Sequence, residues 1–189
     1  MPASRRAVAT ARSGRYSDGS VASEPCWYFG YGSNMNRGIF EGRRAMRPLA
    51  TRWGWLADHA LRFDLPVGPG ERGCANVVPE PGARTCGVLY LLAGDDCERL
   101  DRSEGVHVGV YRRALVEVVA QDGDVVTAFT YRSSRSDPTR KPSPRYLGLL
   151  LDGAREHGLP AEYVAFLAAH PLAVDERQPA AVSAKSTVP

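Results

Sequence analysis

The sequence predicts a single α+β domain in which the strands come first and the helices last. Short apolar and aromatic runs bounded by turn residues fill the stretch from residue 27 to residue 131. Two segments whose apolar residues recur at helical spacing follow, from residue 144 onward. No unit of 20–50 residues repeats, so a solenoid is excluded. Strands followed by helices indicate an α+β domain.

Length and composition are those of one ordinary globular domain with tails. The chain has 189 residues, of which 43% are hydrophobic and 24% charged, and these values exclude a fibre or a coiled coil. Residues 1–24 are rich in Arg, Ser and Ala, so we expect a disordered basic tail, although this composition also resembles an organellar transit peptide. Residues 178–189 are expected to form a second tail. A folded domain over residues 25–177 is left.

Charge, hydropathy and cysteine spacing exclude several classes of function. The net charge of +3 is small and owes much to arginines of the N-terminal tail, so nothing argues for a nucleic-acid partner. No apolar run approaches the ~20 residues of a membrane helix, so no membrane insertion is expected. The cysteines form no C-x-x-C pair and the histidines no H-x-x-x-H pair, so no metal site is predicted. We expect free thiols in a cytoplasmic protein.

The first predicted strand covers residues 27–31, which are aromatic and apolar. It runs into Gly32, Ser33 and Asn34, which are turn and N-cap residues at which a short helix can start. Five further apolar runs are predicted as strands, most of them paired antiparallel: residues 60–65, 74–78, 86–92, 111–120 and 125–131. The last two are joined across Asp122-Gly123, which is a strong hairpin signal.

A short helix is predicted over residues 95–103, and Gly105 stops it. Glu104 therefore lies at a helix-to-strand corner, where stiff backbone would hold its carboxyl group. Two interpretations stay open for Glu104: a general acid or base, or a solvated side chain of the kind common at helix ends. His107 either orients Glu104 or has a structural or exposed position.

The last third of the sequence predicts two helices. Ser143 at the N-cap and Pro144 in the first turn open a helix over residues 145–157. Gly158 ends this helix, and Pro160 starts another. The loop before them is long, polar and rich in Arg and Ser, so it is either a lid over a site or a surface connection.

The stretch Gly30-Tyr31-Gly32-Ser33-Asn34-Met35-Asn36 does not match the common glycine-rich motifs. A dinucleotide fingerprint would need Gly at position 35, and a P-loop would need Gly-Lys before Ser or Thr. A hydrolase elbow would need Gly at positions 31 and 35, so Ser33 is not an elbow nucleophile. A loop of small residues after a strand does expose backbone N–H groups, which favour an anion or a developing oxyanion. The alternative is a plain capped turn.

Taken together, these segments resemble the γ-glutamylcyclotransferase family in residues, order and spacing. The family's Tyr-Gly-Ser-Asn motif is matched by Tyr31-Gly32-Ser33-Asn34, and its Gly-Val strand by Gly87-Val88-Leu89-Tyr90. Its Leu-Asp-x-x-Glu-Gly-Val segment is matched by Leu100-Asp101-Arg102-Ser103-Glu104-Gly105-Val106. Tyr131 at the end of a late strand and the helix entry Pro142-Ser143-Pro144-Arg145-Tyr146 continue the resemblance, which covers about residues 26–170.

The resemblance implies a small mixed, mostly antiparallel β-barrel with helices packed outside and the site in its mouth. It implies a cofactor-free enzyme of glutathione metabolism that cyclises a γ-glutamyl amide to 5-oxoproline and releases the free amine. The substrate's own α-amino group is the nucleophile in that reaction, so no triad or metal is needed. The family's catalytic glutamate falls on Glu104. The implied substrate-binding residues are Tyr31, Gly32, Ser33, Asn34, Met35, Tyr131 and Tyr146.

Other hypotheses stay open beside this one. The substrate could be a γ-glutamyl amine, or a carrier-bound γ-glutamyl intermediate whose acidic carrier would suit the basic loop over residues 132–141. A non-catalytic module of the same fold that binds a small acid is a further class, and the presence of Glu104 favours the enzyme over it. A homodimer is compatible with the sequence.

Overall fold

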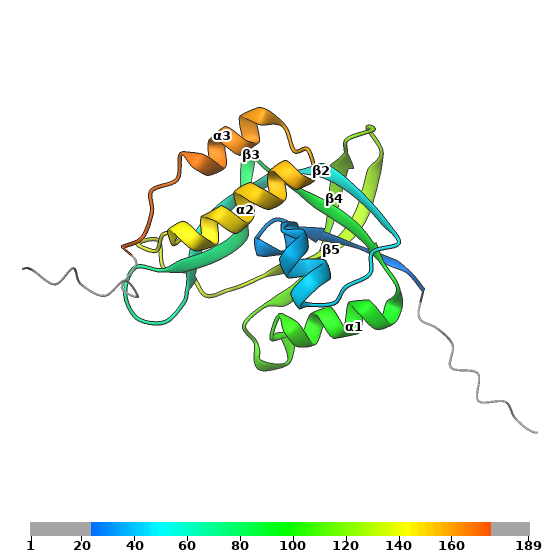
Figure 1. The fold of residues 1–189 in the computed structure, drawn as a ribbon, viewed down its shortest axis with the longest axis horizontal. Coiled ribbons are helices and arrows are strands. Elements are labelled where there is room, and N and C mark those ends of the chain that lie inside the picture. The colour runs from blue at the N-terminus through cyan, green and yellow to red at the C-terminus, as the bar shows by residue number, and fades with distance from the viewer. Residues whose placement is uncertain (1–23, 175–189) are drawn as a thin grey trace, which may run out of the picture.

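A computed structural model, which describes residues 24–174, contains a closed five-stranded β-barrel with helices packed on its outside (Figure 1). The strands are β1 (Cys26–Gly30), β2 (Ala50–Pro66), β3 (Gly73–Leu92), β4 (Arg112–Ala120) and β5 (Val125–Arg132). They close in the order β1-β3-β2-β4-β5. The contact of β5 with β1 is parallel and the other four are antiparallel, so the predicted fold class is confirmed. The predicted tails, except for Glu24, lie outside the described residues.

β1 is the shortest strand and is paired along both of its edges. Its five residues lie opposite Val88–Leu92 of β3, and Tyr28 also lies opposite Phe129 of β5. The aromatic residues that predicted a strand here fill the core, because Tyr28 and Phe29 are buried. The loop that follows β1 therefore starts from a fixed point in the barrel.

β2 and β3 are far longer than the sequence predicts. The expected strands over residues 60–65, 74–78 and 86–92 are parts of one long hairpin, whose β3 arm continues through Pro79, Pro81 and Gly82. The ladder changes register at Asp58, which has a positive φ of 53° and accepts a hydrogen bond from the Gly82 N–H at 2.8 Å. Such irregularities increase the bend of a strand pair. Proline and glycine interrupt the local pattern, and for this reason the hairpin is not visible in the sequence.

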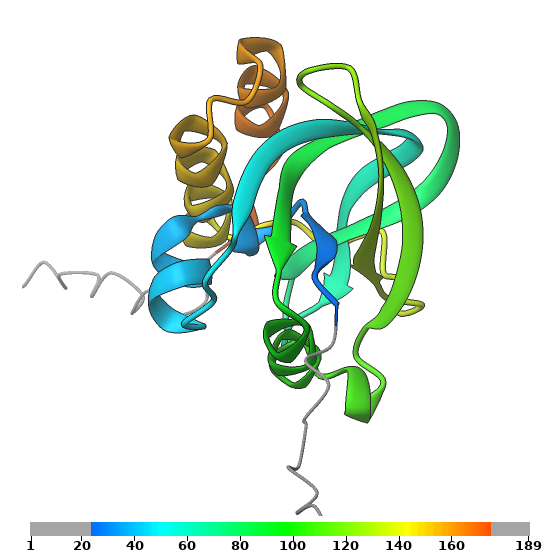
Figure 2. The ribbon, with the colours of Figure 1, turned by 90° about the vertical axis from the view of Figure 1, so that its right-hand side faces the viewer.

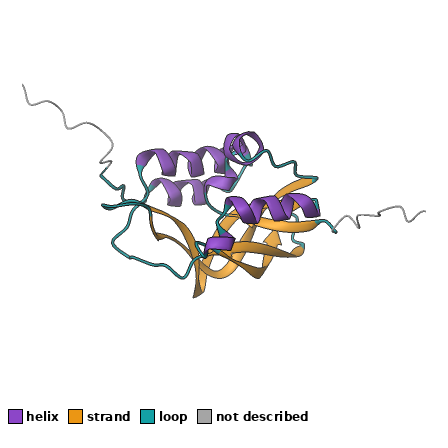
Figure 3. Cartoon of the chain, turned by 90° about the horizontal axis from the view of Figure 1, so that it is seen from below, coloured by secondary structure: helices purple, strands orange, loops and turns teal. Residues whose placement is uncertain are grey.

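The helices α1 (Gly94–Ser103), α2 (Pro144–Glu156) and α3 (Ala161–Ala168) confirm the three helices that the sequence predicts. The short helix expected after Asn34 corresponds to a π-helix, η2 (Gly38–Arg43), whose bounds the sequence does not predict because its two glycines leave no helical pattern. α2, α3 and η2 lie on one side of the barrel, and α1 lies below it (Figure 2). Viewed from below, the helices form a layer over the strands (Figure 3). None of the helices within residues 24–174 is long and apolar enough to cross a membrane.

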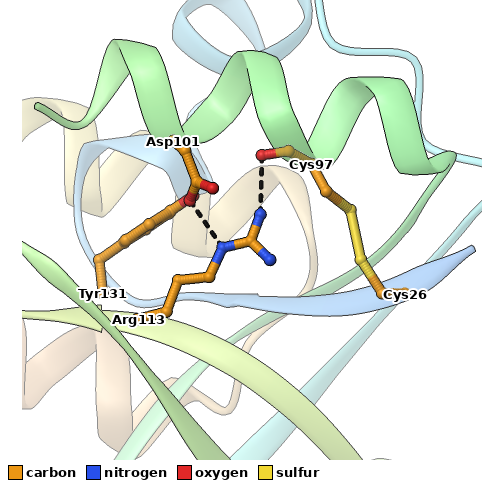
Figure 4. Close-up of a disulfide and its surroundings, with 5 residues drawn as sticks. All are labelled: Cys26, Cys97, Asp101, Arg113 and Tyr131. Atoms are coloured by element: carbon orange, nitrogen blue, oxygen red, sulfur yellow. Dashed lines mark hydrogen bonds and ion pairs between the residues drawn. A yellow bond between two sulfur atoms is a disulfide. The ribbon is translucent and has the colours of Figure 1, made fainter. Parts of the chain in front are cut away.

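A disulfide between Cys26 at the start of β1 and Cys97 on α1 corrects the expectation that all four thiols are free (Figure 4). The two residues are 71 positions apart in the sequence. They meet because α1 packs beside β1, which local sequence patterns do not show. Cys74 and Cys86 are free, as expected.

Contact between α2 and the loop after β1 requires a glycine. Gly153 on α2 is buried against the backbone of this loop, and a Cβ atom at this position would lie 2.5 Å from the Met35 carbonyl carbon. Ser143 caps the same helix, since its hydroxyl accepts a hydrogen bond from the Tyr146 N–H at 3.2 Å. Ser143 therefore fixes the start of α2, and Gly153 fixes how closely α2 approaches the loop.

Gly153→Ala is expected to lower the free energy of unfolding by about 1–3 kcal/mol, because the added methyl group would push α2 away from the loop. Gly148→Ala on the same helix is the matched control. A Cβ there meets nothing within 4 Å, so alanine should stabilise the helix by up to about 1 kcal/mol. Urea unfolding of both variants measures the difference. Equal effects would show that the close approach at Gly153 does not limit the packing.

Candidate active site

A small cavity lies at the end of β1, in the mouth of the barrel. The loop after β1 forms one side of it, and Glu104 forms another. Glu104 is 70 residues away from Asn34 of this loop in the sequence. The lining residues are Tyr28, Tyr31, Gly32, Ser33, Asn34, Ala75, Glu104, Tyr111, Tyr131 and Tyr146. The structure thus brings together every predicted site residue except Met35, whose side chain is fully buried in the core.

The loop presents backbone donors to this cavity. Residues 33–35 form one 3₁₀ turn, η1 (Ser33–Met35), in which the Met35 N–H donates to the Gly32 carbonyl at 3.0 Å. Within residues 24–174, the N–H groups of Gly32, Ser33 and Asn34 have no hydrogen-bond partner. Glycine at position 32 allows close packing, because a Cβ there would lie 3.2 Å from the Tyr146 hydroxyl, tighter than most Cβ contacts. Three free amides at the start of a turn can bind an anion.

Asn34 connects the loop to the carboxylate. Its side-chain Nδ2 donates to the Tyr28 hydroxyl at 2.8 Å and to Glu104 Oε1 at 2.9 Å. Its Oδ1 is buried and accepts no hydrogen bond from any described residue. A buried carbonyl oxygen without a donor is uncommon in proteins, so this atom is available to a donor group of a ligand.

Glu104 follows the last residue of α1 and is mostly shielded, with 11% of its side chain exposed. Arg44, the residue after η2, approaches Glu104 Oε1 at 3.0 Å through a guanidinium nitrogen and also donates to the Ser103 hydroxyl. Asn34 and Arg44 thus both bind Oε1. Oε2 receives no hydrogen bond or ion pair from the part of the chain that the structure describes, so it is the oxygen free to exchange a proton with a ligand.

α1 is attached to the barrel at the turn that precedes Glu104. Asp101 Oδ1 accepts hydrogen bonds from the Tyr131 hydroxyl at 2.7 Å and from Arg113 Nε at 2.6 Å (Figure 4). Arg113 also donates to the Cys97 carbonyl at 2.9 Å and lies over the Phe129 ring. The carboxylate of Glu104 is therefore positioned by strands β4 and β5 as well as by its own helix.

The cavity walls are tyrosine hydroxyls that stay protonated. Burial raises the pKa values of Tyr28, Tyr31, Tyr111, Tyr131 and Tyr146 above the ordinary tyrosine value. Their hydroxyl groups are therefore neutral hydrogen-bonding groups at physiological pH. Glu104 is the single carboxylate among the lining residues.

Two sequence-based alternatives are corrected by the structure. His107 lies in the exposed turn η3 (Val106–Val108) and makes no hydrogen bond or ion pair to Glu104. The basic loop over residues 132–141 does not line the cavity and packs instead against residues 68–72, where Arg140 donates to the Gly68 and Gly70 carbonyls. Neither the orienting role of His107 nor the lid has a basis in this geometry.

Comparison with known proteins finds relatives that match most of the chain. Residues 84–167 match the model of the AIG2-like family. The γ-glutamylcyclotransferase of Bos taurus is 32% identical over 76% of this chain and 78% of its own length. The γ-glutamyl cyclotransferase verK of Clonostachys rogersoniana is 34% identical over 75% of this chain and 94% of its own.

The chain belongs to the γ-glutamylcyclotransferase family. A solved structure described as a γ-glutamyl cyclotransferase superposes with a TM-score of 0.73 at 27% identity, covering 84% of this chain and 95% of the other. The match therefore extends over the barrel and its helices, and not only over the strand and loop that carry the Tyr-Gly-Ser-Asn motif.

Several residues of this family member's site are not predicted from its sequence. Arg44 lies in a segment without a helical or strand pattern, and its partner Glu104 is 60 residues away. Tyr111 lines the cavity, and its hydroxyl donates to the Ala75 carbonyl at 3.1 Å. Asp101, which belongs to the matched Leu-Asp-x-x-Glu segment, is the one supporting residue that the sequence motif contains, but the motif does not show that it binds Tyr131 and Arg113.

Asp101→Asn is expected to lower kcat by about 10-fold with little change in KM, because it weakens the contacts to Tyr131 and Arg113 that fix the end of α1. Asp152→Asn is the matched control, since Asp152 forms only an exposed pair with Arg155 at 3.5 Å. Steady-state kinetics on both variants measures the effect. An Asp101 variant as active as the parent would show that Glu104 needs no support from the barrel wall.

Proposed function

We propose that the protein cyclises a γ-glutamyl amide to 5-oxoproline and releases the free amine, with Glu104 as the general acid and base. One observation carries this proposal: Glu104 is the sole carboxylate lining a cavity that it shares with the free amides of the loop after β1. A substrate that contains its own nucleophile needs only a proton acceptor, an oxyanion site and a fixed bent pose.

The proposed reaction moves two protons from the substrate α-nitrogen to the leaving nitrogen, one after the other, with Glu104 as the carrier. Oε2 of Glu104 removes a proton from the substrate α-ammonium group, and the resulting amine attacks the γ-carbonyl carbon. A new C–N bond closes the five-membered ring and the carbonyl oxygen becomes an oxyanion. Collapse of this intermediate breaks the original amide C–N bond as Glu104 returns the first proton to the leaving nitrogen. The ring nitrogen then gives its second proton to the carboxylate, which passes it to the released amine, so the products are 5-oxoproline and an ammonium ion.

Asn34 and Arg44 would position the carboxylate for this exchange. Both bind Oε1 of Glu104, so rotation of the carboxylate would be restricted and Oε2 would stay available to the substrate. The buried Asn34 Oδ1 would accept a second hydrogen from the substrate α-ammonium group. The nucleophile would then lie between two acceptors, Asn34 Oδ1 and Glu104 Oε2.

The amides of Gly32, Ser33 and Asn34 have two possible tasks, which are to hold the substrate α-carboxylate or to stabilise the oxyanion. Tyr31, Tyr131 and Tyr146 would line the site as neutral hydrogen-bonding groups. A substrate-binding role for each of these residues stays a prediction. A cytoplasmic location, the absence of a nucleic-acid partner and a homodimer are also predictions.

The activity is tested by incubating the purified protein with γ-glutamyl dipeptides, γ-glutamyl amines and glutathione, and by measuring 5-oxoproline by chromatography. Formation of 5-oxoproline together with an equal amount of free amine is expected for at least one substrate. The same reactions with chelator added test whether a metal is needed, and no loss is expected. Binding of γ-glutamyl compounds without any 5-oxoproline would instead identify a non-catalytic binding module.

Glu104→Gln is expected to lower kcat by about 10²–10⁴-fold, the usual contribution of general acid–base catalysis, because glutamine keeps the size but cannot accept the proton. KM should change little. Glu98→Gln on the exposed face of the same helix is the matched control and should retain the parent rate. A Glu104 variant with the parent kcat would remove this residue from the mechanism.

A further inference from the structure

A second, much larger concavity adjoins the cavity that holds Glu104. It has a volume of about 720 Å³, against about 40 Å³ for the cavity. Ser33 and Tyr146 line both, so the two spaces meet at these residues. The small cavity has room only for the reacting end of a substrate. The groove beyond Ser33 and Tyr146 is the adjoining space with room for the part of a substrate that follows the scissile amide.

The groove has a single sign of charge. Four arginines line it, from three separate parts of the fold: Arg43 and Arg44 at the end of η2, Arg72 before β3, and Arg145 in the first turn of α2. No Asp or Glu is among its lining residues. A concavity lined by charges of one sign attracts and concentrates ligands of the opposite sign.

Three of these four charges have no ion-pair partner within residues 24–174. Arg44 pairs with Glu104, whereas Arg43, Arg72 and Arg145 form no ion pair with any described residue. The carboxylate next to Arg72, Glu71, pairs with Lys141 instead. Arginine Nε atoms are normally hydrogen-bonded when buried, but Arg72 Nε is buried without an acceptor. An acceptor supplied by a ligand would satisfy it.

We propose that Arg43, Arg72 and Arg145 form a leaving-group subsite that selects γ-glutamyl substrates whose amine part carries at least two negative charges. This inference rests on the proposed cyclotransferase activity and specifies its substrate class. The volume of the groove accommodates an amine part larger than one amino acid. Guanidinium groups bind carboxylates and phosphates through charge-assisted hydrogen bonds. These hydrogen bonds are about twice as strong as those between neutral groups.

The test measures kcat/KM for three matched substrates: γ-glutamyl-aspartate with two carboxylates on its amine part, γ-glutamyl-alanine with one, and γ-glutamyl-alanine amide with none. We expect a rise of about 10-fold from the amide to the dicarboxylate at low ionic strength, mostly through KM, and a smaller rise at 0.5 M NaCl because salt screens exposed charges. Equal values for the three substrates would overturn the subsite. Absence of 5-oxoproline from every substrate would instead overturn the proposed activity, so the two failures are distinguishable.

Variants assign the preference to individual arginines. Arg72→Gln is expected to reduce the ratio of kcat/KM between dicarboxylate and amide by about 5–10-fold, and Arg72→Lys, which keeps the charge, should retain most of the ratio. Arg145→Gln, at an exposed position that tolerates substitution, is the second variant if Arg72→Gln folds poorly. Arg155→Gln on α2, which lies outside the groove, is the control and should leave the ratio unchanged. An unchanged ratio in both the Arg72→Gln and Arg145→Gln variants would contradict the proposal.

Discussion

The pairing of β1 on both of its edges is the constraint on which the site depends. Five residues are held between β3 and β5, and the parallel contact with β5 closes the barrel. A strand without a free edge cannot slide or tilt without breaking two ladders. Its C-terminal end therefore holds the loop from Gly32 to Asn34 in place, and its N-terminal end holds Cys26 against α1. Both components of the site are positioned from the same strand.

The site itself concentrates one ionisable carboxylate among neutral donors. Burial keeps the surrounding tyrosines protonated, so they can orient a polar substrate without competing for its proton. The single carboxylate is fixed through one oxygen by Asn34 and Arg44, and its other oxygen is left for chemistry. A reaction whose nucleophile belongs to the substrate needs no further catalytic side chain, which agrees with a site made largely of aromatic walls and backbone amides.

Charge is distributed unevenly between the two spaces that meet at Ser33 and Tyr146. Arg44 of the groove is paired with Glu104 of the cavity, whereas the other three guanidinium groups that line the groove form no ion pair with any described carboxylate. Unpaired guanidinium groups reduce the stability of the folded protein, but they keep their hydrogen-bond donors available for a ligand. Under the proposed function, shape would select the reacting end of the substrate and charge its leaving end.

The sequence by itself determined the α+β class, the hairpin at Asp122-Gly123 and the three α-helices, because these depend on local patterns and short-range capping. The barrel and a shared site for Gly32 and Glu104 were implied by the resemblance of the sequence motifs to those of the family. The sequence did not determine the long β2–β3 hairpin, whose prolines and glycine are tolerated only where the paired strands change register. It also did not show the disulfide, the burial of Met35 or the pairing of Arg44 with Glu104. Those contacts join segments about 60–70 residues apart or bury one side chain of a loop, and only closure of the barrel decides which residues then face each other.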